Sequence, residues 1–116
     1  MHEMSIAQEI LRLIQQTAHD AKAERVKKIW LKVGAFSGIM IDSLQFGLEI
    51  LAKDTLADSA TINIEPIPLV VKCPSCQKEF HIEPTNFICP QCENIELEII
   101  SGEELELVSV DVDMPF

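Results

Sequence analysis

The chain has 116 residues, of which 47% are hydrophobic, and 19 acidic side chains against nine basic ones give a formal net charge of -10. This length fits one domain with at most a small appendage, and the hydrophobic share is too high for a disordered chain. The acidic balance argues against nucleic-acid binding, which depends on Lys and Arg, and favours cations and basic protein surfaces as partners.

No apolar run approaches the roughly 20 residues that a membrane-spanning helix needs. The N-terminus also lacks a positively charged start followed by an apolar stretch, which is the pattern of a secretory signal. We therefore expect a soluble, cytoplasmic protein that does not act on a membrane.

The first predicted element is an amphipathic helix over residues 5–24. Apolar side chains and one threonine recur there at spacings of three and four, which places them on one helix face. They are Ile6, Ile10, Leu13, Ile14 and Thr17. Ser5 and Gln8 have the spacing of a capping box, so the helix is expected to begin at Ser5 and to leave residues 1–4 as a free lead.

A strand follows over residues 26–34, where apolar Ile29, Leu31 and Val33 alternate with residues of the other face. A second amphipathic helix is expected over residues 42–55.

A second strand is expected over residues 60–71, and its prolines, Pro66 and Pro68, confine it to an edge or an irregular stretch. The last strand spans residues 103–113. Its apolar alternation changes phase, and a β-bulge near Val108 would reconcile the two halves.

This order of elements predicts an α+β fold of two layers, a small mixed three-stranded sheet with both helices on one face. A small zinc-ribbon lobe with two CxxC knuckles is inserted before the last strand. The predicted domains are a discontinuous α/β domain, residues 1–71 and 99–116, and a metal-binding domain, residues 72–98.

All four cysteines fall in that insert with the spacing C-x2-C-x12-C-x2-C: Cys73, Cys76, Cys89 and Cys92. Two such knuckles present four thiolates tetrahedrally, which is typical of a structural zinc site, although iron in a rubredoxin-like site shares the geometry. The lobe is too small to build its own core, so we expect metal binding to supply its folding free energy.

Two histidines are weaker candidates. His81 could lie beside the thiolates or replace one, but a surface position is the simpler interpretation. His19 fits a solvated residue near a helix C-terminus. Because the four-thiolate site is closed and neither a nucleophile–base pair nor a phosphate loop is evident, we expect no enzymatic activity.

The N-terminus offers a second set of metal donors. These are the α-amine of Met1, the backbone nitrogen and imidazole of His2, and the backbone nitrogen or carboxylate of Glu3. Nitrogen and oxygen donors in one plane suit Cu(II) or Ni(II). From the residues alone the signal is weak, because a histidine at position 2 is ordinary.

The stretches "MHEMSIAQEIL", "VKKIWLKVGAFSGI", "SLQFGLEIL", "CPQC" and "SGEELELVSVDV" together resemble the HypA/HybF family of nickel-incorporation factors for NiFe-hydrogenase maturation, and in some organisms for urease. The resemblance covers the whole chain in order. It implies an α/β nickel-binding domain interrupted by a zinc domain. It also implies that His2 is a nickel ligand, that Glu3 contributes at least its backbone nitrogen, that the Met1 amine is a further donor, and that the four cysteines bind zinc.

The resemblance further implies a nickel metallochaperone that carries Ni(II) as transient cargo. Its partners would be a HypB-type GTPase, the hydrogenase large-subunit precursor and, in some organisms, urease accessory proteins; a homodimer is left open. The chain departs from the family where Gln77 and Glu93 stand in place of a glycine after each knuckle, which puts the shape of the zinc lobe in doubt. Two alternatives remain: a zinc-ribbon adaptor without a second metal, and a rubredoxin-like electron-transfer protein.

Overall fold

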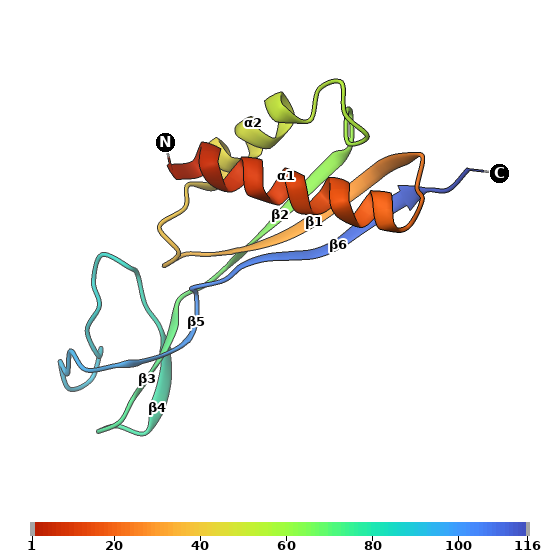
Figure 1. Cartoon of the computed structure of the whole chain (residues 1–116). Helices are drawn as coiled ribbons and strands as arrows, with labels where there is room; N and C mark the ends of the chain where they lie inside the picture. Colours follow the sequence, from red (N-terminus) through yellow and green to blue (C-terminus); the bar gives the residue numbers. More distant parts are fainter. Residues whose placement is uncertain (1, 116) are drawn as a thin grey trace.

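The structure, a computed structural model, describes residues 2–115, and of His2 it describes the backbone only (Figure 1). In chain order the elements are α1 (His2–Asp20), β1 (Arg25–Gly34), α2 (Ile41–Leu51), β2 (Thr61–Ile67), β3 (Val70–Cys73), β4 (Lys78–His81), β5 (Glu98–Ser101) and β6 (Leu105–Asp113). Within the described part of the chain, no helix is long and apolar enough to cross a bilayer.

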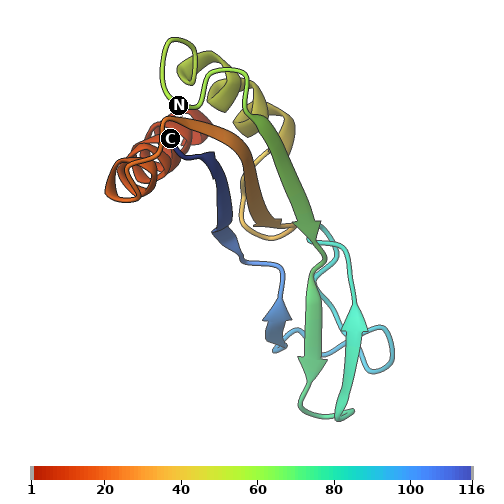
Figure 2. The ribbon, with the colours of Figure 1, turned by 90° about the vertical axis from the view of Figure 1, so that its right-hand side faces the viewer.

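The main sheet has the order β2-β1-β6. The strands β1 and β2 run parallel and are joined through α2, while β6 runs antiparallel to β1. The two helices pack against each other, α1 towards β6 and α2 towards β2, and both lie on one face of the sheet (Figure 2). The predicted two-layer fold with a mixed three-stranded sheet is therefore confirmed.

The core lies between this sheet and the helices. On β1, Ile29, Leu31 and Val33 are each 1% exposed, whereas Trp30 between them is 42% exposed on the other face. This is the alternation expected of a strand that is covered on one side only. The helices complete the core with Ile14 and Leu44, which are fully buried.

The bulge predicted in the last strand is confirmed. Trp30 pairs with Ser109 while the next residue, Leu31, pairs with Leu107, so Val108 is the extra residue. The insertion lets Leu107 and Val110 both pack against the core on either side of the phase change.

Three predicted helix boundaries are wrong, one of them the end of the first helix, which lies at Asp20 and not at residue 24. The first helix begins at His2 and not at Ser5, so residues 2–4 are not a free lead. Met4 explains the extra turn, because its sulfur packs close to Gly47 of α2 and continues the apolar face of α1 by one turn. The second helix ends at Leu51, not at residue 55. There the Thr55 hydroxyl donates to the Ala52 carbonyl at 2.6 Å, a local bond that favours a turn over further helix.

The expected strand over residues 60–71 is divided in two at Pro68 and Leu69. Its first part, β2, contains Pro66 and lies at an edge of the main sheet, as predicted. Its second part, β3, is the centre of a separate antiparallel sheet of order β4-β3-β5. Proline has no N–H to donate, which favours the change of sheet at Pro68.

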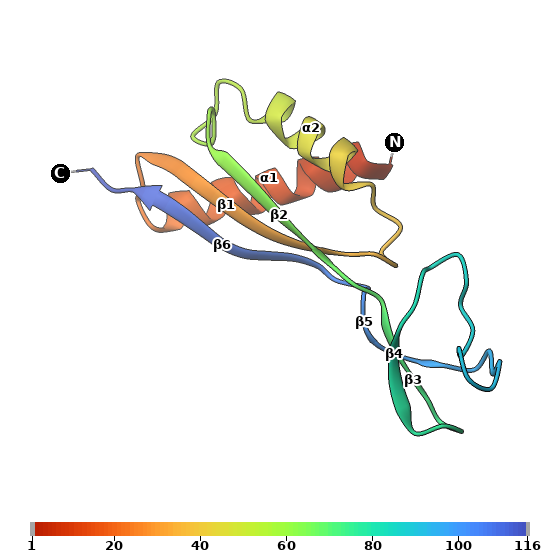
Figure 3. The ribbon, with the colours of Figure 1, turned by 180° about the vertical axis from the view of Figure 1, so that it is seen from behind.

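The small sheet carries the cysteine loops and extends away from the helices, which gives the molecule an elongated shape of 60 × 28 × 17 Å (Figure 3). Contrary to expectation it has an apolar cluster of its own, in which Leu69, Val71 and Ile82 are buried. The predicted boundaries at residues 71/72 and 98/99 fall inside β3 and β5, and the division into two domains remains a prediction.

An aromatic contact links the two parts. Phe36, in the loop after β1, stacks on Phe87 of the cysteine lobe, with ring centroids 5.5 Å apart and planes inclined by 26°. Stacked rings at such distances stabilise a contact beyond the area they bury.

Candidate metal centre

The four cysteines come from two loops that meet at one end of the small sheet. Cys73 ends β3 and Cys76 lies in the turn before β4, while Cys89 and Cys92 lie in the long connection from β4 to β5. All four sulfur atoms lie within 4.8 Å of one another. The arrangement brings together the complete set of cysteines that the spacing predicted.

The spacing of these sulfurs fits a single metal ion. The Cys73 and Cys92 sulfurs are 3.6 Å apart, and those of Cys76 and Cys89 are 3.8 Å apart. A tetrahedral zinc with Zn–S bonds of about 2.3 Å places its sulfurs about 3.8 Å from one another. Both distances are far longer than the roughly 2.05 Å of a disulfide. The site is therefore arranged to bind a metal ion rather than to form a covalent bridge.

Each knuckle is closed by the same backbone turn. The N–H of Gln77 donates to the Cys73 carbonyl at 2.8 Å, and the N–H of Glu93 donates to the Cys89 carbonyl at 3.0 Å. Both residues adopt the left-handed backbone conformation, with φ of 60° and 62°. Side chains make this conformation costly, which is why glycine suits the position. The two positions where the resemblance led us to expect glycine are therefore strained, and the four sulfurs still come together.

Backbone N–H groups of the knuckles point at the first sulfur of each pair. The N–H of Cys76, assisted by the neighbouring Cys92 side chain and the N–H of Ser75, lowers the pKa of the Cys73 thiol to about 6. The N–H groups of Cys92 and Gln91 likewise lower the pKa of Cys89. Donors fixed in this way favour the thiolate, which is the form that binds metals.

A residue that sequence analysis did not identify, Asn94, ties the two knuckles together. Its side-chain amide donates to Ser75 Oγ at 3.5 Å and approaches the Cys73 sulfur at 3.9 Å, both in the first knuckle. Its carbonyl accepts the N–H of Cys89 in the second knuckle at 2.9 Å. Its role depends on contacts with both knuckles, and no spacing pattern in the sequence indicates them.

Neither candidate histidine joins the cluster. His81 is exposed at the end of β4, and His19 is exposed in the last turn of α1. Among the residues that the structure describes, the four cysteines form the only group of metal-binding side chains of three or more. The simpler interpretation of both histidines, as surface residues, agrees with these positions.

The predicted N-terminal donors are described only in part. Met1 and the side chain of His2 lie outside what the structure describes. The backbone of His2 and Glu3 forms the first turn of α1, where N–H groups have no acceptor within the helix. Glu3 is half-buried beside a hollow of about 190 Å³ that Met4 and, from α2, Ser43, Phe46 and Gly47 also line.

Comparison with known proteins covers nearly the whole chain. A family model described as "Hydrogenase/urease nickel incorporation, metallochaperone, hypA" matches residues 1–112. The chain is 36% identical over 113 residues to hydrogenase maturation factor HypA of Dehalococcoides mccartyi strain CBDB1, covering 97% of this chain and 95% of that protein. It is 41% identical over 116 residues to the HypA of Desulfatibacillum aliphaticivorans, covering 99% and 89%.

Two solved structures share the fold. The solution structure of the nickel metallochaperone HypA from Helicobacter pylori matches with a TM-score of 0.67 at 18% identity, over 97% of this chain and 98% of that one. A further solution structure of a HypA protein gives 0.69 at 20% identity, over 97% and 96%.

The full-length family match and the relatives at 36% and 41% identity agree with the arrangement of helices, sheets and cysteines in this structure. HypA proteins are maturation factors and not enzymes, which confirms that expectation. This chain belongs to the HypA family of nickel metallochaperones that serve hydrogenase and urease maturation.

Proposed function

We propose that this chain binds Ni(II) at its N-terminus, through the Met1 amine, the His2 backbone nitrogen and imidazole, and a donor from Glu3. It then delivers the ion to the large-subunit precursor of a NiFe hydrogenase. The observation that carries the proposal is the family match, which begins at residue 1 and so includes all three donors.

The start of α1 suits this role. The N–H groups of a first helical turn have no acceptor within the helix, so the backbone nitrogens of His2 and Glu3 are not engaged in helical hydrogen bonds and are available to a metal. Nickel bound there would lie at the start of α1, beside α2 (Figure 1).

The four cysteines would hold Zn(II) as a structural ion. Four thiolates satisfy its tetrahedral preference and leave no open position, so the ion supports the lobe and performs no chemistry. Free thiols in such a site fit a reducing compartment, and we place the protein in the cytoplasm. An iron-loaded site would instead favour the electron-transfer alternative, and it would colour the purified protein red.

The proposed partners follow from the family and from charge. They are a HypB-type GTPase, the hydrogenase precursor and, where urease is served, its accessory proteins. The net charge of -10 suits basic surfaces on these partners. Because nitrogen donors of this kind bind Cu(II) more tightly than Ni(II), correct delivery must depend on docking and on metal supply.

The test is a nickel titration of three proteins: the untagged chain, a chain extended before Met1, and the His2→Ala variant. Extension turns the α-amine into an amide, which is a far poorer ligand, and the substitution removes the imidazole. We expect both changes to remove most nickel binding while zinc content and fold are kept. Equal nickel affinity in all three would show that the N-terminus is not the site.

A further inference from the structure

The helix α1 and the outer edge of β6 enclose an apolar groove. Ile6, Ile10 and Leu13 line it from the helix, and Leu105 and Leu107 line it from the strand, around a volume of about 170 Å³. Leu13 and Leu105 remain 41% and 42% exposed. A volume of this order, lined by leucine and isoleucine, accommodates an apolar group the size of benzene.

The same strand also offers an unpaired edge. In the main sheet β6 is the last strand and pairs only with β1. The Gly34 N–H donates to the Glu104 carbonyl at 2.7 Å, so the backbone of Glu104 faces β1. Because backbone groups alternate along a strand, those of Leu105 and Leu107 face away from β1, beside the groove. The groove is therefore the place of a fourth strand, with hydrogen-bonding groups and apolar packing supplied by the same residues.

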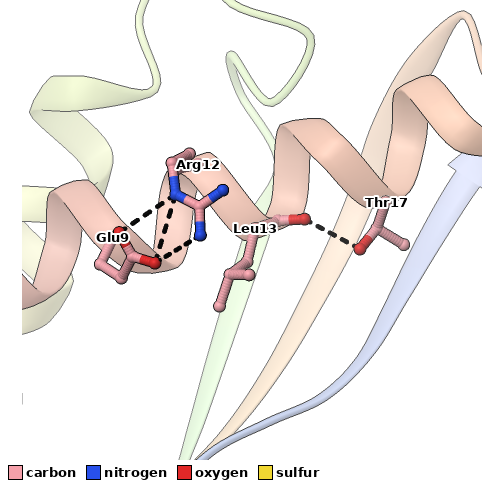
Figure 4. A network of polar contacts seen from close by, with 4 residues as sticks. All are labelled: Glu9, Arg12, Leu13 and Thr17. Atoms are coloured by element: carbon pink, nitrogen blue, oxygen red, sulfur yellow. Dashed lines mark hydrogen bonds and ion pairs between the residues drawn. The ribbon is translucent and has the colours of Figure 1, made fainter.

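The charged residues of β6 and around the groove indicate which kind of strand would bind there. The other face of β6 carries Glu106 and Asp111, opposite Lys32 and Lys28 of β1. On the groove side the charge of Glu9 is already engaged by Arg12, whose Nη2 lies 2.6 Å from its carboxylate, while Leu13 points towards the strands (Figure 4). An added strand would therefore meet leucines on one face and, on the other, Glu106 and Asp111, which form no ion pair among the described residues although lysines lie opposite them in the register. Alternating apolar and basic residues would satisfy both faces.

A second copy of this chain fits less well. Pairing β6 with β6 around the groove would place Glu106 against the same residue of the second copy, and like charges directly opposite are destabilising. The other edge strand, β2, contains Glu65 and Pro66, so it offers no cation and lacks one backbone donor.

We propose that the groove between α1 and β6 binds an extended, basic segment of a partner protein, which adds to β6 as a fourth strand. Main-chain hydrogen bonds to Leu105 and Leu107 would give affinity, and the groove and the acids would give specificity. The surface is distinct from the N-terminal donors and does not depend on nickel being bound there.

The probe is a synthetic peptide of alternating valine and lysine, titrated into the full zinc-bound protein and followed by amide chemical shifts. We expect changes confined to β6 and to residues 6–13, together with new protection of the Leu105 and Leu107 amides. Binding should weaken with added salt. A peptide with glutamate in place of lysine should not bind, nor should one N-methylated on the amides that face β6.

Leu105→Glu and Leu13→Glu should each weaken binding about tenfold or more, because a charge replaces apolar surface in the groove. Val108→Glu is the matched control: Val108 is 47% exposed on the same strand but does not line the groove, so binding should be kept. Absence of peptide binding at millimolar concentration, equal binding of the glutamate peptide, or indifference to both leucine substitutions would overturn the proposal. A concentration-dependent dimer that Leu105→Glu dissociates would overturn it in favour of a second copy.

Discussion

Gly34, at the end of β1, and Gly102, between β5 and β6, lie in direct backbone contact, so that a Cβ added at Gly34 would collide with the Gly102 carbonyl group. The Phe36 N–H donates to that same carbonyl at 2.7 Å. Gly102 has a φ of 119°, a conformation that other residues rarely adopt. This contact, with the stacking of Phe36 on Phe87, forms the junction between the two sheets.

The junction gives the first prediction. Gly34→Ala forces a methyl group against fixed backbone, and we expect it to lower the free energy of unfolding by about 1–3 kcal/mol, measured by denaturant titration. Gly38→Ala is the control, since nothing lies within 4 Å of an added Cβ there and only its positive φ of 79° costs about 1 kcal/mol. A milder effect at Gly34 than at Gly38 would contradict the close contact.

The second prediction concerns the metal centre. Cys73→Ser removes one of the four thiolates and opens the site, so we expect loss of bound zinc and local unfolding of residues 72–98 while the helices and main sheet remain folded. Metal analysis and amide hydrogen exchange would measure the two effects. Gln91→Ala, an exposed change in the second knuckle, should keep both zinc and protection. Stoichiometric zinc in Cys73→Ser would contradict the assigned ligands.

The third prediction concerns the strained turn residues. Glu93→Gly should stabilise the zinc-bound lobe by about 1 kcal/mol, because glycine adopts the left-handed conformation without steric cost. Gln77→Gly should help less, since the Gln77 side chain donates to the Pro74 carbonyl at 2.8 Å and that bond is lost.

The comparison is made by thermal unfolding of the zinc-bound proteins. Glu93→Ala is the control, because it removes the charge but keeps the Cβ. If Glu93→Ala stabilised as much as Glu93→Gly, the gain would come from charge and not from the backbone.

The fourth prediction is that nickel binding weakens on acidification. An imidazole must be neutral to bind a metal, and its reference pKa is about 6.5. Protonation therefore competes with nickel as the pH falls, and affinity should drop between about pH 7.5 and pH 6. Calorimetric titrations at several pH values would measure it, and an affinity independent of pH over this range would argue against His2 as a ligand.

The fifth prediction is that nickel binding unwinds the first turn of α1. Consecutive backbone nitrogens can enter one coordination plane only if the His2 backbone departs from helical dihedral angles, which are about −63° for φ and about −42° for ψ. Amide chemical shifts of Glu3, Met4 and Ser5 should move away from helical values on addition of Ni(II). Helical shifts retained in the nickel-bound protein would exclude a planar set that includes two adjacent backbone nitrogens.

Local sequence patterns were sufficient to predict those features of the fold that depend on neighbouring residues. The alternation around Trp30 predicted which face of β1 is buried, and the phase change around Val108 predicted the bulge. The spacing of the four cysteines predicted their assembly, because two CxxC turns have few ways to present their sulfurs.

The sequence-based predictions were wrong or incomplete where the structure depends on contacts between residues far apart in the sequence. The capping pattern at Ser5 was overridden because Met4 gains a packing partner at Gly47, 43 positions further along the chain. Asn94 and the Gly34–Gly102 contact also went unpredicted, since each joins segments that sequence periodicity does not relate.

The sequence by itself determined the order of the two helices and the main-sheet strands, the buried face of β1 and the metal-binding set, because these depend on periods of two, three and four residues and on the chemistry of thiolates. Only the tertiary structure decided where α1 begins, how the chain passes from one sheet to the other, and that α1 and β6 leave an apolar groove at a free edge. Those features depend on contacts between segments that are far apart in the sequence. Which apolar surface stays exposed is known only when the packing of all the elements is known.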